Sequence, residues 1–253
     1  MEILITNDDG IYAEGIAALA SALKKLGNIT VVAPDTQRSA VGHAITIVDP
    51  LRVREARRNG KFFGYATSGT PADCVKLAIK TLMKKRPDLV VSGINLGANT
   101  GYNILYSGTV SGATEGALLG IPSLAVSLAT FTKPDFSAAA AFSAKIAAAM
   151  QKHRLPAGTL LNVNVPAIPA SKIKGSRVTN QSHTSFNDWF DMRKDPRGQI
   201  YYWMDGDFKD KDSDASSDLN AVKAGYVSIT PIQFDLTDYK FIAELENWKL
   251  CGN

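Results

Sequence analysis

The sequence is poor in the residues that build disulfide frames and zinc sites. Among 253 residues there are only two cysteines and three histidines. Cys74 and Cys251 stand far apart, so no CxxC pair is present, and no histidine falls in an HExxH pattern. These absences argue against a disulfide-stapled secreted domain and against a thiolate or histidine zinc site.

Long apolar runs and a dominant charge are also missing. No apolar segment is long enough to cross a bilayer, and the N-terminus lacks the pattern of a signal peptide. The 28 Lys and Arg residues against 24 Asp and Glu residues give a net charge of +4, which is too small to indicate nucleic-acid binding. The sequence therefore predicts a cytoplasmic protein that binds neither membranes nor nucleic acid.

Alternating strand and helix patterns occupy the first two-thirds of the chain. Such alternation is typical of βαβ units, so we expect an α/β fold, with a Rossmann-like three-layer αβα core around a mainly parallel sheet, over residues 1–166. The expected strands are 3–6, 29–33, 62–66, 89–92, 123–127 and 160–165. The expected helices are 16–26, 70–85, 109–119 and 135–152.

The pattern changes after Pro166. Residues 167–253 are expected to form a β-rich C-terminal extension of one continuous domain, with a hairpin and a strand that returns to the core at 226–230. The charged stretch 209–218 is predicted to be a loop. A terminal helix near 238–250 is expected to serve oligomerisation.

The first expected strand runs directly into two adjacent carboxylates, in the sequence TNDDG at residues 6–10. Ligands of open α/β sheets bind beyond the carboxyl ends of the strands, and hard cations prefer oxygen ligands. Asp8 and Asp9 therefore predict a site for a divalent cation at this edge of the sheet. The alternative is that one of them only caps the following helix.

Two further loops follow expected strands. The segment PDTQRSA at residues 34–40 offers the Ser39 hydroxyl and the Arg38 guanidinium, which suits phosphate. The segment GINLGANTG at residues 93–101 offers the amides of Asn95 and Asn99 between glycines. It is neither a dinucleotide GxGxxG nor a Walker loop. An ordinary turn is the alternative for both segments.

A fourth loop, SGTVSG at residues 107–112, stands at an expected helix start. Exposed N–H groups and the helix dipole favour anions there, so we interpret Ser107 and its neighbours as a phosphate site rather than a plain N-cap. His43 follows the Ser39 loop, and we expect it to be a surface or core histidine rather than a catalytic one.

Several ordered motifs along the chain resemble one known family. They are TNDDG at 6–10, APDTQRS at 33–39, SGTPADCV at 68–75, SGINLGANTG at 92–101, YSGTVSGATEG at 106–116 and GYVSITP at 225–231. Together they resemble the SurE family of stationary-phase survival proteins over essentially the whole chain.

This resemblance implies a metal-dependent phosphomonoesterase that acts on nucleoside 5′-monophosphates, and also on 3′-monophosphates and short polyphosphate. It implies that Asp8, Asp9, Ser39 and Asn95 bind one divalent cation, Mg²⁺ or Mn²⁺, in each subunit. Asp8, Asp9 and Asn95 would act in catalysis. The phosphate and substrate contacts would come from Ser39, Asn95, Asn99, Ser107, Gly108 and Thr109. The family forms homodimers, often paired into homotetramers, with exchanged C-terminal segments.

Two other classes of function remain open at this point. One is a module that binds nucleotides or phosphate without turnover, and the other is a structural protein whose glycine loops are only turns. The sequence does not indicate which nucleobase the site prefers or which of the two metals it uses, and it does not decide between dimer and tetramer.

Overall fold

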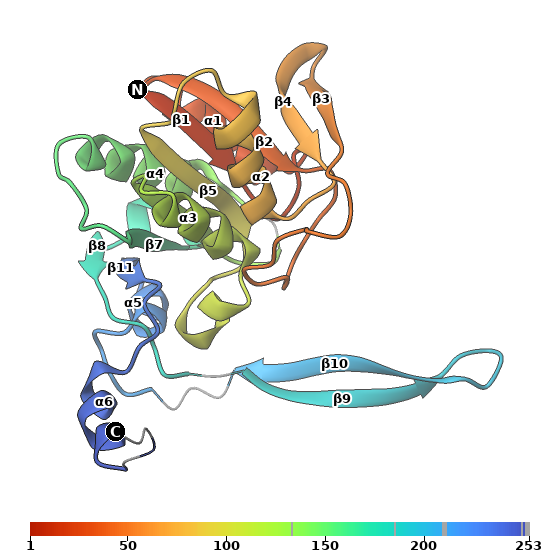
Figure 1. The fold of residues 1–253 in the computed structure, drawn as a ribbon, viewed down its shortest axis with the longest axis vertical. Helices are drawn as coiled ribbons and strands as arrows, with labels where there is room; N and C mark the ends of the chain where they lie inside the picture. Colours follow the sequence, from red (N-terminus) through yellow and green to blue (C-terminus); the bar gives the residue numbers. More distant parts are fainter. Residues whose placement is uncertain (133, 185, 209–211, 249, 251–253) are drawn as a thin grey trace.

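The computed structural model describes residues 1–132, 134–184, 186–208, 212–248 and 250. A nine-stranded sheet with flanking helices forms the body of the molecule, and a long two-stranded hairpin projects from it (Figure 1). The strands of the large sheet are β1 (Glu2–Thr6), β2 (Asn28–Pro34), β3 (Val53–Arg58), β4 (Lys61–Thr67), β5 (Leu89–Leu96), β6 (Ser123–Ala129), β7 (Thr159–Pro166), β8 (Ser176–Val178) and β11 (Val227–Gln233).

Helices and the hairpin complete the chain. The α-helices are α1 (Glu14–Leu23), α2 (Pro71–Leu77), α3 (Gly108–Leu118), α4 (Ser137–Met150), α5 (Asp218–Lys223) and α6 (Tyr239–Glu246). Shorter turns of other helix types are η1 (Ala78–Leu82), η2 (Gly101–Leu105) and η3 (Ala170–Lys172). The hairpin consists of β9 (Phe186–Lys194) and β10 (Ile200–Phe208). None of the described helices combines the length and the apolar character needed to cross a membrane.

The order of strands in the large sheet is β3-β4-β2-β1-β5-β6-β7-β11-β8. Six neighbouring strands, from β4 to β7, run parallel to one another. Strand order reverses between β1 and β5, because the chain first builds outward to β2 and later crosses back. Such a reversal is where open α/β sheets bind ligands.

Two pairs of helices cover the faces of the sheet. On one face Ile16, Leu19 and Leu23 of α1 pack with α4 against the buried side chains of β1 and β5. On the other face α2 packs against Leu4 and Val90, and α3 packs beside α2. The expected α/β fold with a mainly parallel sheet and helices on both faces is confirmed by this arrangement.

Part of the extension beyond residue 166 completes the large sheet. Strand β11 pairs antiparallel with β7, and β8 pairs with β11 at the edge. The hairpin of β9 and β10 instead stands clear of the body (Figure 1). A domain boundary at residue 166 stays a prediction. Part of the expected loop 209–218 lies outside the described residues, as does Cys251.

Two expected elements differ in the structure. The helix expected over 70–85 ends as an α-helix at Leu77, because the chain widens into the π-type turn η1, where the N–H of Met83 donates to the carbonyl of Ala78 at 2.9 Å. The glycine-rich segment expected to be loop from residue 93 continues β5 as far as Leu96. This happens because pairing with β6 resumes after an irregularity, with Asn95 opposite Ser127.

Candidate functional site

The carboxyl ends of β1 and β5 bring the predicted site residues together at the point where strand order reverses. Asp8 and Asp9 follow β1, and Asn95 lies near the end of β5. The N–H of Leu96 donates to Oδ2 of Asp9 at 3.3 Å, which ties the two strand ends to each other. The structure thus places the carboxylate pair beside the glycine-rich segment, although the two are almost ninety positions apart in the sequence.

Asp8 is buried, with 4% of its surface exposed. The Thr109 hydroxyl at the start of α3 donates to Oδ1 of Asp8, and this contact favours the ionised carboxylate. Burial nevertheless outweighs it and, together with the neighbouring charge of Asp9, raises the pKa of Asp8 to about 6. The fold therefore holds a carboxylate in a place where its charge is poorly solvated.

Asp9 is less buried than Asp8, and burial also raises its pKa. Neither carboxylate caps a helix, because α1 begins only at Glu14 with Ala13 as its N-cap. The alternative reading of the pair as a helix cap is therefore wrong. Two adjacent carboxylates at a strand end without a capping role leave cation binding as their simplest chemical use.

The Ser39 loop lies against this edge through its backbone. The N–H of Arg38 donates to the carbonyl of Asp8 at 2.7 Å, and Ser39 lines the same cleft as Asp8. The hydroxyl of Ser39 accepts a hydrogen bond from Gln37 at 2.8 Å. The guanidinium of Arg38 donates instead to the carbonyl of Ser68 at 2.8 Å, so its observed partner is the backbone of another loop.

The two asparagines of the glycine-rich segment differ in their surroundings. Asn95 lines the cleft and donates to the carbonyl of Gly97 at 2.7 Å. Asn99 is buried, and its side-chain amide donates to the Ser127 hydroxyl at 2.9 Å. Its backbone N–H donates to Oδ1 of Asn164 at 2.8 Å. These bonds fasten the segment to β6 and β7, so Asn99 has an evident structural role beside its predicted contact with substrate.

Helix α3 begins at the cleft. The Ser107 hydroxyl accepts from the N–H of Val110 at 3.1 Å, so Ser107 is the N-cap of this helix and also lines the cleft. Gly108 comes so close to Asp8 that a Cβ there would lie 2.7 Å from the Cβ of Asp8. Only glycine permits this approach, which brings the positive end of the helix dipole against the carboxylate pair.

These groups surround a cleft of about 200 Å³. Asp8, Ser39, Asn95, Asn99 and Ser107 all line it. Tyr106 and Phe131 also line it, although sequence patterns assign neither of them a functional role. Both directly flank segments that did carry a signal, since one precedes the α3 start and the other follows β6.

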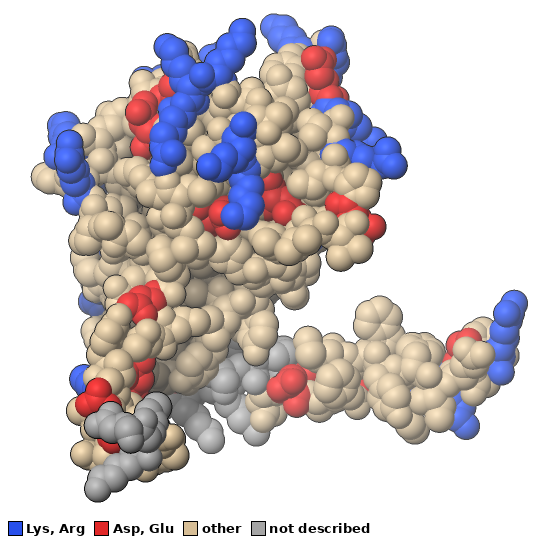
Figure 2. All heavy atoms as spheres, in the orientation of Figure 1, with Lys and Arg blue, Asp and Glu red and all other residues tan. Residues whose placement is uncertain are grey.

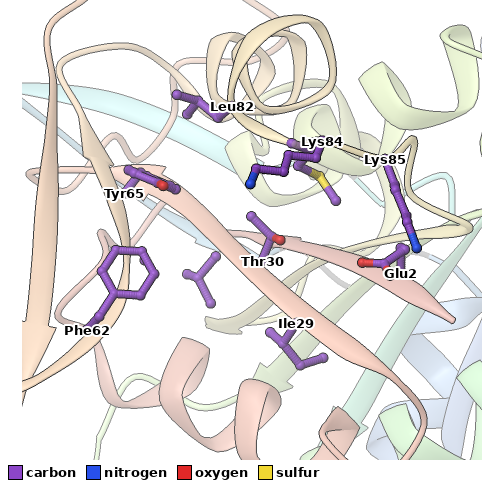
Figure 3. Close-up of a pocket in the computed structure, with 11 residues that line it drawn as sticks. Glu2, Ile29, Thr30, Phe62, Tyr65, Leu82, Lys84 and Lys85 are labelled. Carbon is purple, nitrogen blue, oxygen red and sulfur yellow. The ribbon is translucent and has the colours of Figure 1, made fainter.

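A second hollow, of about 350 Å³, lies at the opposite ends of the strands. Figure 3 shows Phe62 and Tyr65 on one wall and Lys84 and Lys85 on the other. It opens where β2 and β4 diverge, since these strands pair only near their carboxyl ends. It contains none of the predicted site residues, and we assign it no role.

The donor set formed by the cleft and the adjacent Asp9 fits a hard divalent cation. Two carboxylates, a hydroxyl and an amide supply only oxygen ligands, and Mg²⁺ in proteins commonly uses one or two carboxylates with water completing its shell. No lysine or arginine within the described ranges forms an ion pair with Asp8 or Asp9. The described residues contain no group of three or more His, Cys, Asp or Glu side chains placed to hold a metal ion, so this donor set has only two carboxylates.

Sequence reasoning missed a buried ion cluster behind the cleft. Glu115 of α3, whose side chain is 3% exposed, lies 2.9 Å from Nε2 of His43 and 2.6 Å from Nζ of Lys76. The two partners lower the pKa of Glu115 against the effect of burial. His43 therefore holds the Ser39 loop to α3. The available signal was one acidic residue within a helix whose other side chains are all uncharged.

Comparison with known proteins gives one consistent result. A family model described as "Survival protein SurE" matches residues 3–188. The chain is 52% identical to a protein of Syntrophobacter fumaroxidans named 5′-nucleotidase SurE, over 99% of this chain and all of the relative. A protein of Natranaerobius thermophilus with the same name is 48% identical, over 98% of this chain and 99% of the relative.

A solved structure agrees with these sequence matches. The crystal structure of the SurE protein from Aquifex aeolicus superposes with a TM-score of 0.86 at 41% identity, covering 98% of this chain and all of that one. The family match, the identities over nearly full length and the shared fold all point the same way. The chain belongs to the SurE family.

Proposed function

We propose that this protein is a divalent-metal-dependent phosphomonoesterase that hydrolyses nucleoside 5′-monophosphates to nucleoside and phosphate. The observation that carries the proposal is the meeting of Asp8, Asn95 and Ser107 at the start of α3 in one cleft at the strand-order reversal, with Asp9 bonded to Leu96 beside it. Full-length relatives named 5′-nucleotidase support the same reaction class. Activity on 3′-monophosphates and short polyphosphate is a further part of the proposal.

In this proposal Asp8, Asp9, Ser39 and Asn95 bind one Mg²⁺ or Mn²⁺. When bound, such a cation neutralises charge on the phosphoryl group and favours deprotonation of the attacking water. Asp8 or Asp9 accepts the proton of that water. The catalytic residues are therefore Asp8, Asp9 and Asn95.

The start of α3 binds and orients the phosphate. The N–H of Gly108 has no acceptor among the residues that the structure describes, and the dipole of α3 favours an anion at this end. The hydroxyls of Ser107 and Thr109 lie at the same helix start. Fixed donors of this kind contribute by positioning and by electrostatic stabilisation of the transferred group.

The test is phosphate release from AMP by metal-stripped protein, with and without added Mn²⁺ or Mg²⁺. We expect release only with metal. A protein that binds AMP calorimetrically but releases no phosphate with either metal, across a panel of nucleotides, would instead be a binding module without turnover.

We further propose that the protein forms homodimers or homotetramers through its C-terminal extension. Antiparallel register places the side chains of Phe190, Met192, Ile200, Tyr202 and Met204 on one face of the hairpin, and all five are exposed. Figure 2 shows mostly uncharged side chains along this face of the hairpin, with acidic side chains near its base and both acidic and basic ones toward its tip. An isolated two-stranded hairpin is marginally stable, and a large exposed apolar face marks an interaction site.

Helix α6 adds to this surface. The described part of the chain around it exposes the apolar side chains of Tyr239, Phe241, Ile242, Leu245 and Trp248. A second copy of the chain is the occupant we propose for both surfaces.

A charge on the apolar face of the hairpin should disrupt assembly. We expect Phe190→Asp to lower the solution mass, measured by light scattering at micromolar protein, while Asp191→Asn on the other face leaves it unchanged. A wild-type protein that is monomeric at these concentrations would refute the assembly proposal.

A further inference from the structure

The cleft at the strand ends is too small for a whole nucleotide. Its volume of about 200 Å³ lies below the range of about 300–1,000 Å³ that small-molecule sites usually span. Apart from Asn103 and Tyr106, the polar side chains on its walls are the ones assigned to the cation and the phosphate. A nucleoside monophosphate whose phosphate occupies these groups must therefore extend its base to the rim of the cleft.

Two exposed aromatic rings stand at that rim. Tyr106, between η2 and α3, is 64% exposed, and Phe131, just after β6, is 74% exposed, although both line the cleft. Single exposed apolar residues are common on protein surfaces, but two large rings at the mouth of one polar cleft form a specific arrangement. Each presents apolar surface to water that a flat ligand would cover.

The backbone supports the position of Phe131. Its ring rests against Gly97 of the glycine-rich segment, so closely that a Cβ on Gly97 would overlap the ring. Gly97 also has a φ of +111°, a conformation that residues with side chains rarely adopt. The glycine thus makes room for the aromatic ring beside Asn95 and Leu96, which line the same cleft.

We propose that Tyr106 and Phe131 bind the nucleobase of the substrate by stacking, and so make this site favour nucleotides over phosphomonoesters that lack a base. This inference rests on the proposed nucleotidase function. Every base has a π face, so stacking tolerates all four bases. The expected specificity is therefore for the presence of a base and only weakly for its identity.

The decisive comparison is between AMP and ribose 5-phosphate, which share the phosphate and the sugar but differ in the base. We expect the double variant Tyr106→Leu/Phe131→Leu to raise KM for AMP by about 5- to 100-fold, the range expected from loss of base–aromatic stacking. The KM for ribose 5-phosphate and the kcat for both substrates should stay within about two-fold, because phosphate and metal contacts remain.

Two matched variants act as controls. Phe62→Leu makes the same substitution at an exposed phenylalanine outside this cleft and should leave both substrates unaffected. Phe131→Trp keeps an aromatic ring and should retain most of the affinity for AMP. Equal losses for AMP and ribose 5-phosphate, or a change in solution mass that accompanies the loss, would overturn the proposal by assigning the rings to local structure or to a subunit contact.

Calorimetric binding separates this inference from the proposed function. If the wild-type protein with Mn²⁺ binds AMP more tightly than ribose 5-phosphate and the double variant does not, the stacking role stands even without turnover. If the wild-type protein hydrolyses both compounds with equal KM and binds them equally, the phosphatase stands and the stacking role is refuted.

Discussion

Replacing Asp8 by asparagine should abolish phosphate release and, at the same time, stabilise the metal-free protein. Loss of one electrostatic group at a reacting centre typically costs a factor of about 10²–10³. Because Asp8 is also a proposed metal ligand, we expect turnover to fall by about 10³-fold or more. Phosphate release at saturating Mn²⁺ measures this loss.

The gain in stability follows from the burial of Asp8. Its pKa of about 6 in the folded protein exceeds its ordinary value of 3.8, so between these pH values the folded state binds more protons than the unfolded state. The wild-type protein therefore loses stability as the pH rises from about 4 to 6. Asp8→Asn removes that loss and should raise the free energy of unfolding at pH 7 by about 1–3 kcal/mol.

Thermal melting from pH 4 to pH 8 without metal tests the prediction. The variant should melt about 2–4 °C higher per kcal/mol at neutral pH, and the difference should vanish toward pH 4. Mn²⁺ should raise the melting temperature of the wild-type protein only. Asp88→Asn is the control, because Asp88 lies just before β5, at the end of that strand away from the cleft. A variant that melts lower than the wild type, or that still responds to Mn²⁺, would contradict the role of Asp8.

Removing both partners of Glu115 should have the second large effect. In the double variant His43→Ala/Lys76→Met a buried carboxylate loses both its partners. Breaking a buried ion pair from one side costs about 3–5 kcal/mol, and the partial exposure of His43 and Lys76 puts the expected cost at about 3 kcal/mol at pH 7. Chemical denaturation at pH 7 measures it.

The dependence on pH identifies the cause. His43 and Lys76 lower the pKa of Glu115 below its ordinary value of 4.5, so their stabilisation is complete above that pH and disappears as the pH falls through the lowered value. In the double variant burial acts alone and raises the pKa, so stability should increase as the pH falls. The difference in the free energy of unfolding between the wild-type protein and the double variant should therefore be largest near neutral pH.

A mutant cycle provides the control. With Glu115→Gln already in place, the same two substitutions should cost much less, since no buried charge remains to be paired. An equal cost in both backgrounds would show that His43 and Lys76 stabilise the fold by packing alone.

The sheet and its functional edge could be predicted from local sequence patterns. The apolar run 3–5 predicts β1 because it is bounded at once by polar residues, and Asp8 and Asp9 at its end predict chemistry at that edge. Parallel strands bring their carboxyl ends together whatever their separation in the chain. The convergence of Asp8 with Asn95 therefore needed no knowledge of individual contacts.

Contacts between distant side chains could not be predicted in this way. Thr109 is 101 positions from Asp8, and His43 is 72 positions from Glu115. Nothing in the pattern around one member identifies the other, because helix orientation decides which side chains meet. The π-type turn after Leu77 could not be predicted either, because its residues suit an ordinary α-helix equally well.

The hairpin shows another limit of prediction from sequence. Its strand β10 opens with five consecutive apolar or aromatic residues, 200–204, and a short run of this kind is typical of a strand that is buried on both faces. In this chain the apolar face of β9 and β10 is exposed. A single sequence does not say whether such a face is covered by its own chain or by another.

The position of β11 has a consequence for synthesis. This strand covers the edge of β7, yet about 60 residues separate the two along the chain. A ribosome that has finished β7 has therefore made most of the sheet but left this edge open, and the strand that covers it follows only about 60 residues later. Unpaired edges of this kind are templates for aggregation. Nascent chains that stall between these two strands are thus the ones most in need of a chaperone.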